Sequence, residues 1–521
     1  MQLHQMFIEI AKSNAKKIGV YDIATGKDIT YERMLIAALI LAKKFSGYKG
    51  KYLGIMVPTS AGCMLSILGT LMCGKIPVMI NYSTGARENC FYAQETCSFK
   101  TIITSKKLLE KINIKTVDGM IFLEDIMASL SLFDKLPALI KSKLSAKKII
   151  SAVHKGPESE VSVILFTSGS EKEPKAVQLS HKNILHNINN IPKIVDLRPD
   201  DIYLANLPLF HIFGLTIDFW LPLSFGGTMV AYPNPLDYKI ICRIVKKYQV
   251  SIMAGTPAFY YGYLKKSEPG DFASLRLAVA GADKLTPHIY EGFVKKHNVR
   301  IMEGYGTTET SPVISVNSER YSKVGSVGKP LPGVQVKIID IETSEELPRN
   351  EEGKVIVKGD LVMEGYLGDI EETSLRIRNG WYDTGDMGVM DEEGYLWHRG
   401  RLKRFVKVGG EMVSLVRVEG VMEKLLPDDS VCCVVDVPNP TKGADIVAAI
   451  ATTEIDRRKI LKEMAKQLPS IAVPKDIYFI ENIPMMGSGK VNFREVEQIC
   501  RDMQSNGTKE LKSEEIKKLK K

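Results

Sequence analysis

Short apolar runs alternate with longer amphipathic runs through the first 400 residues of this 521-residue chain. Residues 51–58 and 75–82 have the composition of buried strands, and the apolar segment between them, which begins at Ala61, has the length of a helix. The same alternation returns in the strand-like runs 201–208, 227–233, 250–257 and 275–282. Consecutive strands joined by helical crossovers pair in parallel. The sequence therefore predicts an α/β fold, with a large N-terminal domain of mixed and parallel sheets and flanking helices.

The pattern changes near Gly325, where glycines begin to separate short strand-like runs. Runs of this kind are typical of antiparallel β structure, and they predict a small β-barrel-like part. A shorter series of strands and helices follows and predicts a small, mobile α+β domain. We place the boundary between domains 1–402 and 403–521. The lysine-rich tail, residues 509–521, is expected to form a short charged helix or a frayed end.

The composition is that of a globular protein, with 45% hydrophobic and 25% charged residues. The formal net charge of +9 is spread along the chain and does not indicate nucleic-acid binding. Eight cysteines form no C-x-x-C pair, which fits a reducing compartment. Lys75 and Pro77 interrupt the most apolar stretch, residues 61–80, so we expect a buried helix and strand rather than a membrane span. A cytoplasmic protein is expected, with peripheral contact at the inner membrane left open.

The first segment that suggests chemistry is LFTSGSEKEPKAVQLSH, residues 165–181. The residues that mark it as a phosphate-binding loop are Thr167, Ser168, Gly169, Ser170 and Lys175. Small hydroxyl residues and glycine let N–H groups and hydroxyls surround phosphate oxygens, and lysine adds a positive charge. The chain contains neither G-x-x-x-x-G-K-[ST] nor G-x-G-x-x-G, which excludes a Walker A loop and a dinucleotide fingerprint. An ordinary turn is the alternative interpretation.

Two further segments combine hydroxyl, carboxylate and aromatic residues. In EGYGTTETSPV, residues 303–313, Tyr305 offers a face for stacking on a base, and Glu309 is a hard oxygen ligand of the kind that Mg²⁺ prefers. In WYDTGDMG, residues 381–388, Asp386 is suited to accept hydrogen bonds from ribose hydroxyls, with Arg401 as a neighbouring donor. The alternatives are a strand end with a buried tyrosine and a pair of ordinary turn aspartates.

The fourth segment, MMGSGKVNFRE at residues 485–495, displays Lys490 on a Gly–Ser–Gly loop. Most lysines are idle surface residues, but a glycine loop gives this one freedom to reach a substrate.

These four segments occur in the order and spacing of one large family. From about residue 5 to 500 the chain resembles the adenylate-forming superfamily of acyl- and aryl-CoA synthetases, peptide-synthetase adenylation domains and luciferases. Within it, the chain is most similar to acyl-acyl carrier protein synthetases, specifically the synthetase half of the bifunctional 2-acylglycerophosphoethanolamine acyltransferase/synthetase of bacterial phospholipid repair. The closer resemblance rests on LFTSGSEKEPKAV, PLFHIFGLT, VAGADKL, EGYGTTE, KRFVKVGGEMVSL, AVPKDI and MGSGK.

The resemblance implies an adenylation domain at 1–402 that binds ATP, Mg²⁺ and an acyl substrate, followed by a mobile domain. The residues that it assigns to the ATP phosphates, adenine and ribose are Thr167, Ser168, Gly169, Ser170, Lys175, Gly281, Ala282, Asp283, Glu303, Gly304, Tyr305, Asp386 and Arg401.

The resemblance also implies catalytic roles. Thr308 would contact the α-phosphate, Glu309 and Thr167 would hold Mg²⁺, and Lys490 would be the adenylation lysine. His211 would lie where the acyl carboxylate approaches, with a satisfied buried histidine as the alternative.

The resemblance implies two further roles, and the chain differs from the family pattern in two places. Lys403 would be the hinge, and Gly409 and Gly410 would give room for a phosphopantetheine arm. Ala176 stands where the family usually has glycine, which would restrict the loop if its φ angle were positive. No histidine has an aspartate five positions later, so the acyltransferase dyad of the bifunctional relative is missing.

The implied activity is ATP-dependent conversion of a fatty acid to acyl-AMP, followed by acyl transfer to the phosphopantetheine thiol of holo-acyl carrier protein. Arg404, Lys407 and Arg417 would form a basic face for that acidic protein. The alternative is a long- or medium-chain acyl-CoA synthetase that uses CoA. A third interpretation, a non-catalytic nucleotide- or acyl-binding relative, is disfavoured by the presence of Lys175, Glu309 and Lys490.

Overall fold

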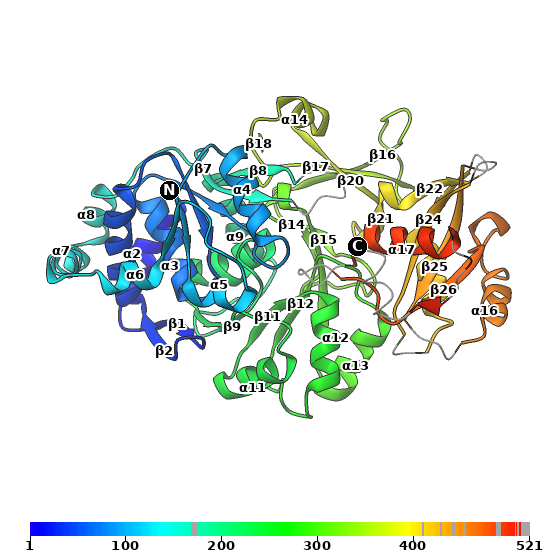
Figure 1. Cartoon of the computed structure of the whole chain (residues 1–521), viewed down its shortest axis with the longest axis horizontal. Coiled ribbons are helices and arrows are strands. Elements are labelled where there is room, and N and C mark those ends of the chain that lie inside the picture. Colours follow the sequence, from blue (N-terminus) through cyan, green and yellow to red (C-terminus); the bar gives the residue numbers. More distant parts are fainter. Residues whose placement is uncertain are drawn as a thin grey trace. The chain divides into compact units, whose positions relative to one another are not determined.

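A computed structural model describes residues 1–167, 174–408, 411–427, 430–439, 443–451, 455–485, 491–505, 507 and 510–511 (Figure 1). Its residues group into two compact units. The first unit comprises 1–336, 356–382 and 394–396, and the second comprises 337–355, 383–393 and 397–521. The boundary at 402/403 remains a prediction about where the chain hinges.

Parallel strands dominate the first sheet of unit one. In the described part of the chain this sheet has nine strands in the order β15–β14–β13–β12–β11–β9–β10–β1–β2. The run from β13 to β1 is parallel throughout, and the pairs β1–β2, β13–β14 and β14–β15 are antiparallel. The strands are β1 (Ile18–Asp22), β2 (Lys27–Thr30), β9 (Ile202–Ala205), β10 (Thr228–Ala231), β11 (Ile252–Gly255), β12 (Leu277–Ala280), β13 (Ile301–Gly306), β14 (Val313–Val316) and β15 (Lys329–Pro330).

The second sheet of this unit has seven described strands in the order β18–β8–β7–β4–β3–β5–β6. The pairs from β7 to β6 are parallel, whereas β7–β8 and β8–β18 are antiparallel. The strands are β3 (Tyr52–Met56), β4 (Ile76–Met79), β5 (Ile102–Thr104), β6 (Met120–Phe122), β7 (Val161–Phe166), β8 (Ala176–Ser180) and β18 (Gly365–Tyr366).

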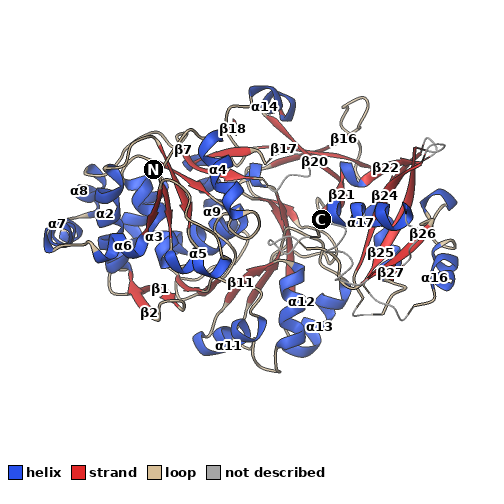
Figure 2. Cartoon of the chain, in the orientation of Figure 1, coloured by secondary structure: helices blue, strands red, loops and turns tan. Residues whose placement is uncertain are grey.

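Helices accompany both sheets, as Figure 2 shows by colour. They are α1 (Leu3–Ser13), α2 (Tyr31–Ser46), α3 (Ala61–Met72), α4 (Ala86–Thr96), α5 (Lys106–Ile112), α6 (Leu123–Ala128), α7 (Leu132–Lys143), α8 (Ala146–Ser151), α9 (His181–Asn190), α10 (Leu221–Phe225), α11 (Tyr238–Tyr248), α12 (Pro257–Lys266), α13 (Pro287–His297) and α14 (Ile370–Arg376). Three short turns of helix, η1 (Ile191–Lys193), η2 (Gly214–Trp220) and η3 (Thr308–Thr310), complete the unit.

Helix α3 explains the most apolar stretch of the sequence. The Ser60 hydroxyl accepts a hydrogen bond from the Cys63 N–H and caps the helix. Nearly all of its residues are buried, and at Gly69 a Cβ would lie 2.7 Å from the Leu41 Cβ of α2. Glycine therefore lets the two helices approach closely, and the predicted buried helix is confirmed. None of the described helices is both long and apolar enough to cross a membrane.

A smaller sheet follows the glycine-rich segment, in the order β16–β17–β20–β19 with β21 paired to β20 among the described residues. Its strands are β16 (Gln335–Ile339), β17 (Glu352–Lys358), β19 (Ile377–Arg378), β20 (Trp381–Met390) and β21 (Leu396–Arg401). The pair β19–β20 is antiparallel, as the sequence predicts.

The C-terminal part of unit two is α+β, as predicted. The strands β24 (Cys432–Asn439), β25 (Gly443–Ile450), β26 (Asp476–Ile480) and β27 (Glu510–Leu511) form one sheet, and β22 (Phe405–Val408) pairs with β23 (Glu411–Ser414). The helices are α15 (Leu415–Glu423), α16 (Arg457–Met464) and α17 (Phe493–Ser505), with short turns η4 (Leu402–Arg404) and η5 (Ser470–Ala472). Alternate residues of β24 face two apolar cores: Val434 lies with α15 and α16, and Cys433 lies with α17.

Three histidines surround the start of α1. The Leu3 N–H donates to Nδ1 of buried His181 at 3.2 Å, and buried His4 donates from Nε2 to the His154 carbonyl at 3.0 Å. His154 in turn lies 2.8 Å from Glu160. Burial lowers the pKa of His4 to about 4 and that of His181 to about 3. Both rings are therefore neutral in the folded chain at neutral pH.

These depressed pKa values predict that acid destabilises the first unit. An unfolded histidine gains a proton as the pH falls through about 6.5 while the folded one does not, so stability is full above that pH and declines below it. Between pH 7 and 5, His4 alone accounts for about 2 kcal/mol of lost unfolding free energy. Urea unfolding at both pH values measures the loss. His4→Gln should flatten the pH dependence, and the exposed-site control His288→Gln should not; equal slopes in all three proteins would contradict the account.

Candidate active site

Two neighbouring parallel strands bring the predicted adenine residues together. Ala280 of β12 is in register with Glu303 of β13, so Gly281, at the end of β12, and Gly304 emerge at the same sheet edge. Ligands of α/β proteins bind at the carboxyl ends of parallel strands, where the loops are free of the ladder. The sheet therefore unites two segments of the sequence that are more than 20 residues apart.

Local contacts fix the shape of this edge. Ala282 has φ +73°, in the left-handed region, and a Cβ at Gly281 would lie 3.2 Å from the Phe213 ring. Glu303 is buried and accepts a hydrogen bond from the Leu285 N–H at 3.4 Å. Burial raises the pKa of Glu303. Its carboxyl thus supports the 281–285 loop from within the fold.

Two hydrogen bonds between Thr167 and Lys175 join the two ends of the predicted phosphate loop. The Thr167 N–H donates to the Lys175 carbonyl at 3.0 Å, and the Lys175 N–H donates to the Thr167 hydroxyl at 3.2 Å. Ser168, Gly169 and Ser170 lie outside the described residues. Ala176 belongs to β8 opposite Phe166 and does not have a positive φ, so the methyl group in place of the usual glycine introduces no backbone strain.

The turn that carries Thr308 and Glu309 is held from several elements. Buried Asn187 of α9 donates to the Thr310 carbonyl at 3.3 Å and accepts from the Val313 N–H at 2.8 Å. The Thr216 hydroxyl of η2 donates to the Ser311 carbonyl, and the Met363 N–H donates to the Glu309 carbonyl at 2.8 Å. The backbone of Glu309 is therefore fixed before any ligand arrives.

Tyr366 contacts both Glu309 and Lys175. Its hydroxyl donates to Glu309 Oε1 at 2.9 Å, and Lys175 Nζ lies 5.2 Å from the centre of its ring. Glu372 of α14 accepts from Lys175 Nζ at 2.5 Å and from Arg376 Nε at 2.8 Å. Sequence reasoning missed Tyr366, Glu372 and Arg376. Tyr366 stands in a short GYL motif, and Glu372 and Arg376 follow it within ten residues, but no spacing ties these residues to Glu309 or Lys175.

His211 lies on the loop after β9, half-buried beside the Phe210 ring at 4.5 Å. Asp218 of η2, fully buried, holds this loop by accepting from the Asn206 and Leu207 N–H groups at 3.2 and 2.9 Å. Burial raises the pKa of Asp218 well above its usual range. The expected position of His211 relative to a substrate carboxylate remains a prediction.

Asp386 and Arg401 form a pair within unit two. Asp386 is buried on β20, with Arg401 Nε at 3.0 Å and His398 Nε2 at 3.6 Å from Oδ1. The two side chains form an ion pair, and the ribose-binding role expected for both remains a prediction. Lys403 is exposed in η4, whereas Gly409, Gly410 and Lys490 lie outside the described residues.

The basic face expected for a carrier protein is smaller than predicted. Arg404 is largely buried, donates to the Glu419 carboxylate at 2.5 Å and to the Val434 carbonyl at 2.7 Å, and stacks on Phe493. It stabilises the fold of unit two instead of facing a partner. Lys407 and Arg417 are exposed.

The oxygen donors fit Mg²⁺, which usually binds through one or two carboxylates and the substrate phosphates. Glu309 offers a carboxylate that Tyr366 holds in place, and Thr167 offers a hydroxyl at the start of the predicted phosphate loop. Among the described residues, no three or more His, Cys, Asp or Glu side chains gather in a group that could hold a metal ion.

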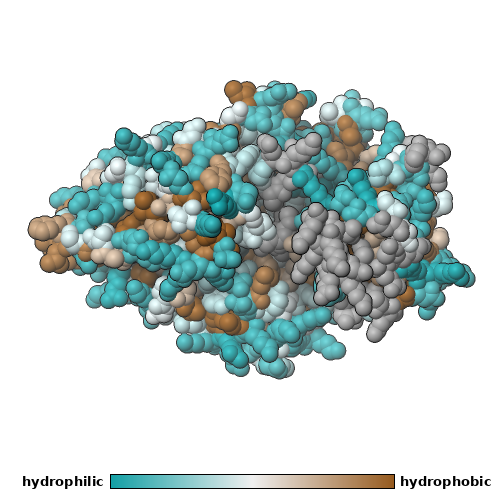
Figure 3. Space-filling model, viewed as in Figure 1, coloured by the Kyte–Doolittle hydropathy of each residue, from teal (hydrophilic) through white to brown (hydrophobic). Residues whose placement is uncertain are grey.

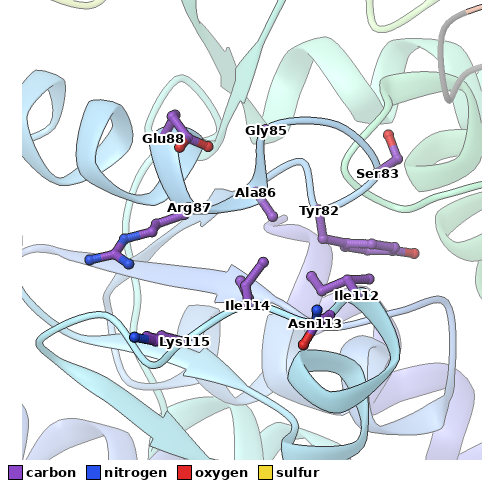
Figure 4. A pocket seen from close by; sticks show the side chains of 10 residues that line it. All are labelled: Tyr82, Ser83, Gly85, Ala86, Arg87, Glu88, Ile112, Asn113, Ile114 and Lys115. Atoms are coloured by element: carbon purple, nitrogen blue, oxygen red, sulfur yellow. The ribbon is translucent and has the colours of Figure 1, made fainter. Parts of the chain in front are cut away.

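A separate open pocket of about 650 Å³ lies between the start of α4 and the end of α5 (Figure 4). Tyr82, Arg87 and Lys115 are among its lining residues. None of the described site residues lines it. Tyr82 nevertheless packs edge-on against Phe210, with ring centres 4.9 Å apart, so the pocket adjoins the His211 loop.

Comparison with known proteins places these residues in a family context. A model described as "AMP-binding enzyme" matches residues 7–367, and one described as "AMP-binding enzyme C-terminal domain" matches 426–490. The chain is 30% identical over 508 residues to a long-chain-fatty-acid–CoA ligase of Bacillus subtilis, covering 89% of each chain. It is 28% identical to the protein of that name from Escherichia coli O6:H1, covering 91% of this chain and 90% of that one.

Solved structures share the fold. ATP-bound MatB from Rhodopseudomonas palustris superposes with a TM-score of 0.82 at 24% identity, covering 96% of this chain and all of that one. The anthranilate CoA ligase AuaEII, solved with anthranoyl-AMP, gives a TM-score of 0.82 at 21% identity, covering 97% and 98%. The fold predicted from the sequence is confirmed.

The contacts of Asn187 predict its importance for the Glu309 turn. Asn187→Ala leaves one buried carbonyl and one N–H without a partner, at about 1–3 kcal/mol each. We expect a loss of about 2–4 kcal/mol in unfolding free energy, since the two groups share one site. Asn190→Ala is the matched control, because Asn190 donates to the His186 carbonyl within its own helix. Urea unfolding of both variants measures the difference, and equal losses would refute the assignment.

Proposed function

The chain belongs to the AMP-binding enzyme family, and from that premise we propose that it activates a fatty acid with ATP to acyl-AMP and transfers the acyl group to the thiol of CoA. The family match supports adenylation. The long-chain substrate and the CoA acceptor are inferred from relatives that align over nearly nine-tenths of both chains.

One observation carries the proposal. Glu309 and Lys175 both contact Tyr366: Glu309 accepts a hydrogen bond from its hydroxyl at 2.9 Å, and Lys175 Nζ lies 5.2 Å from the centre of its ring. A carboxylate able to bind a metal and a cation able to bind phosphate thus meet at one place, on segments 134 residues apart. This is the charge arrangement that a metal–nucleotide complex requires.

The chemistry follows from the poor leaving group of a carboxylic acid. A carboxylate oxygen attacks the α-phosphorus of ATP, the bond to the β-phosphate oxygen breaks, and pyrophosphate leaves with the electron pair. The thiol of CoA, as thiolate, then attacks the acyl carbon and AMP departs. The first step needs positioning and charge neutralisation and no covalent help from the protein. Eight cysteines that hold no catalytic motif are consistent with this.

The residues divide these tasks. Glu309 and Thr167 would hold Mg²⁺, which, when bound, neutralises phosphate charge. Lys175 would leave Glu372 for a phosphate oxygen, and Thr308 would donate to the α-phosphate. Lys490 would add a positive charge beside the reacting oxygen during adenylation. Lys403 is proposed as the hinge that later moves Lys490 away, with Gly409 and Gly410 lining the path of the thiol arm.

Two thiols are candidates for the acceptor of the acyl group. The loop motifs resemble those of acyl-acyl carrier protein synthetases, and this favours holo-carrier protein as a second candidate. Against it, Arg404 is committed to Glu419 and leaves only Lys407 and Arg417 of the expected basic face. The relatives named above are CoA ligases, which supports CoA.

Lys490 should affect one half-reaction only. Lys490→Ala removes a charge contact made in the adenylation transition state and should slow acyl-AMP formation by about 10²–10³-fold. Thioester formation from supplied acyl-AMP should persist at close to the wild-type rate. Stopped assays of each half-reaction measure the two rates, with the exposed-site variant Lys466→Ala as control. Equal losses in both half-reactions would remove Lys490 from the adenylation step.

A competition assay tests the proposed acceptor. We expect kcat/KM for CoA to exceed that for holo-acyl carrier protein by at least tenfold when both are supplied with ATP and mixed fatty acids, and mass spectrometry identifies the thioesters. Raising the ionic strength past about 0.1 M should change the CoA rate little, whereas docking of an acidic protein would weaken. Preferential acylation of the carrier protein would replace CoA in the proposal, and no thioester at all would refute it.

A further inference from the structure

Helix α7 presents its large apolar side chains outward. Leu132 and Phe133 are 79% and 87% exposed, and they continue into a surface that we call the α7 patch. Its members are Leu132, Phe133, Leu136, Leu139, Ile140 and Leu144, all exposed. Figure 3 shows this patch as a brown area at the left end of the view, where Figure 1 places α7. Soluble monomers rarely expose so many apolar side chains together without using them.

The helix is attached by its opposite face, and this face is made of small or polar residues. Ala138 and Ser142 are the buried residues of α7, which packs against α2. The Ser142 carbonyl accepts from Lys12 Nζ of α1 at 2.8 Å, and the half-buried carboxylate of Asp134 lies 3.1 Å from Lys44 of α2. The apolar residues recur at the helical spacing of one outward stripe. The patch is therefore displayed on a firmly held helix.

Lysines flank the stripe. Residues 130–151 contain five lysines against one aspartate, which leaves a net charge of +4. Within the described residues, Lys135, Lys147 and Lys148 are exposed and have no ion-pair partner. Asp134 is committed to Lys44 and to the Ser131 N–H at the start of the helix. Lys143 is paired with Glu32, so three exposed lysines without an ion-pair partner among the described residues accompany the apolar stripe.

From this juxtaposition we propose that the α7 patch binds the surface of an anionic lipid bilayer, with Phe133 and Leu136 inserted among the acyl chains and the lysines at the headgroups. An amphipathic helix with aromatic and aliphatic residues on one side and lysines beside them lies in a membrane interface. Each lysine near such a surface adds attraction to anionic lipid. The inference does not depend on the proposed function.

Two other occupants fit less well. The cores of protein–protein interfaces are depleted in lysine, whereas lysines border this stripe closely. A second copy of the chain, paired through the same surface, would bring two like-charged faces together. A lipid surface has the opposite charge and needs no complementary shape.

Vesicle flotation of the full-length chain tests the proposal. Vesicles of phosphatidylcholine with phosphatidylglycerol should carry the protein upward, and vesicles of phosphatidylcholine alone should carry much less. The double variant Phe133→Ser/Leu136→Ser should lower the apparent partition coefficient at least tenfold, because burying one large apolar side chain is worth roughly a factor of ten. Ile370→Ser, at a site 82% exposed outside the patch, is the matched control and should bind as the wild type does.

A charge variant separates the two contributions. Lys135→Gln/Lys147→Gln/Lys148→Gln should remove most of the preference for anionic vesicles and reduce its dependence on salt, while the patch itself stays intact. Thermal unfolding should be unchanged in every variant, since the altered side chains are exposed. Failure to bind anionic vesicles, or binding that the double variant leaves unaltered, would overturn the proposal. A concentration-dependent dimer lost in the double variant, without vesicle binding, would instead identify a self-association surface.

Discussion

Parallel pairing is the constraint on which the first unit depends. Strands joined by helical crossovers all point the same way, so the loops that follow them collect at one edge. The ladder from β13 to β1 is parallel, and its pairing of Ala280 with Glu303 brings the loop that starts at Gly281 beside Gly304 of β13. After Ala280 the backbone leaves the sheet, and polar residues are tolerated in such a loop. The sheet topology thus decides which segments meet at the candidate site.

Hydrogen bonds from other elements of the fold then hold the candidate site residues in position. Asn187 and Thr216 hold the turn of Glu309 from two different elements, and Tyr366 orients its carboxylate. Asp218 holds the loop of His211 in the same manner, as a buried carboxyl with two N–H donors. Supporting groups of this kind let a metal-binding or phosphate-binding residue act without the cost of ordering it when the ligand arrives.

The sequence allowed the fold class and the main elements to be predicted because periodicity and glycine spacing are local signals. The Ala61 segment became a buried helix, and the alternation along β24 separates two cores. The sequence could not reveal Tyr366 or Glu372 as site residues. The partner of Tyr366, Glu309, lies 57 residues away, and the partner of Glu372, Lys175, lies 197 residues away. Arg404 was misjudged for a related reason: a basic residue in an exposed-looking run proved to be buried against Glu419. Pairing across the fold, rather than residue type, decides such roles.

The most direct measurement of the central claim is exchange of labelled pyrophosphate into ATP in the absence of any thiol. Reversible adenylation predicts exchange that appears only when a fatty acid is added, that requires Mg²⁺, and that falls by about 10²-fold or more in Glu309→Gln, which keeps the size of the side chain but not its charge. Exchange independent of fatty acid, or absent from a protein that still binds ATP, would contradict the account and leave a nucleotide-binding relative without ligase activity.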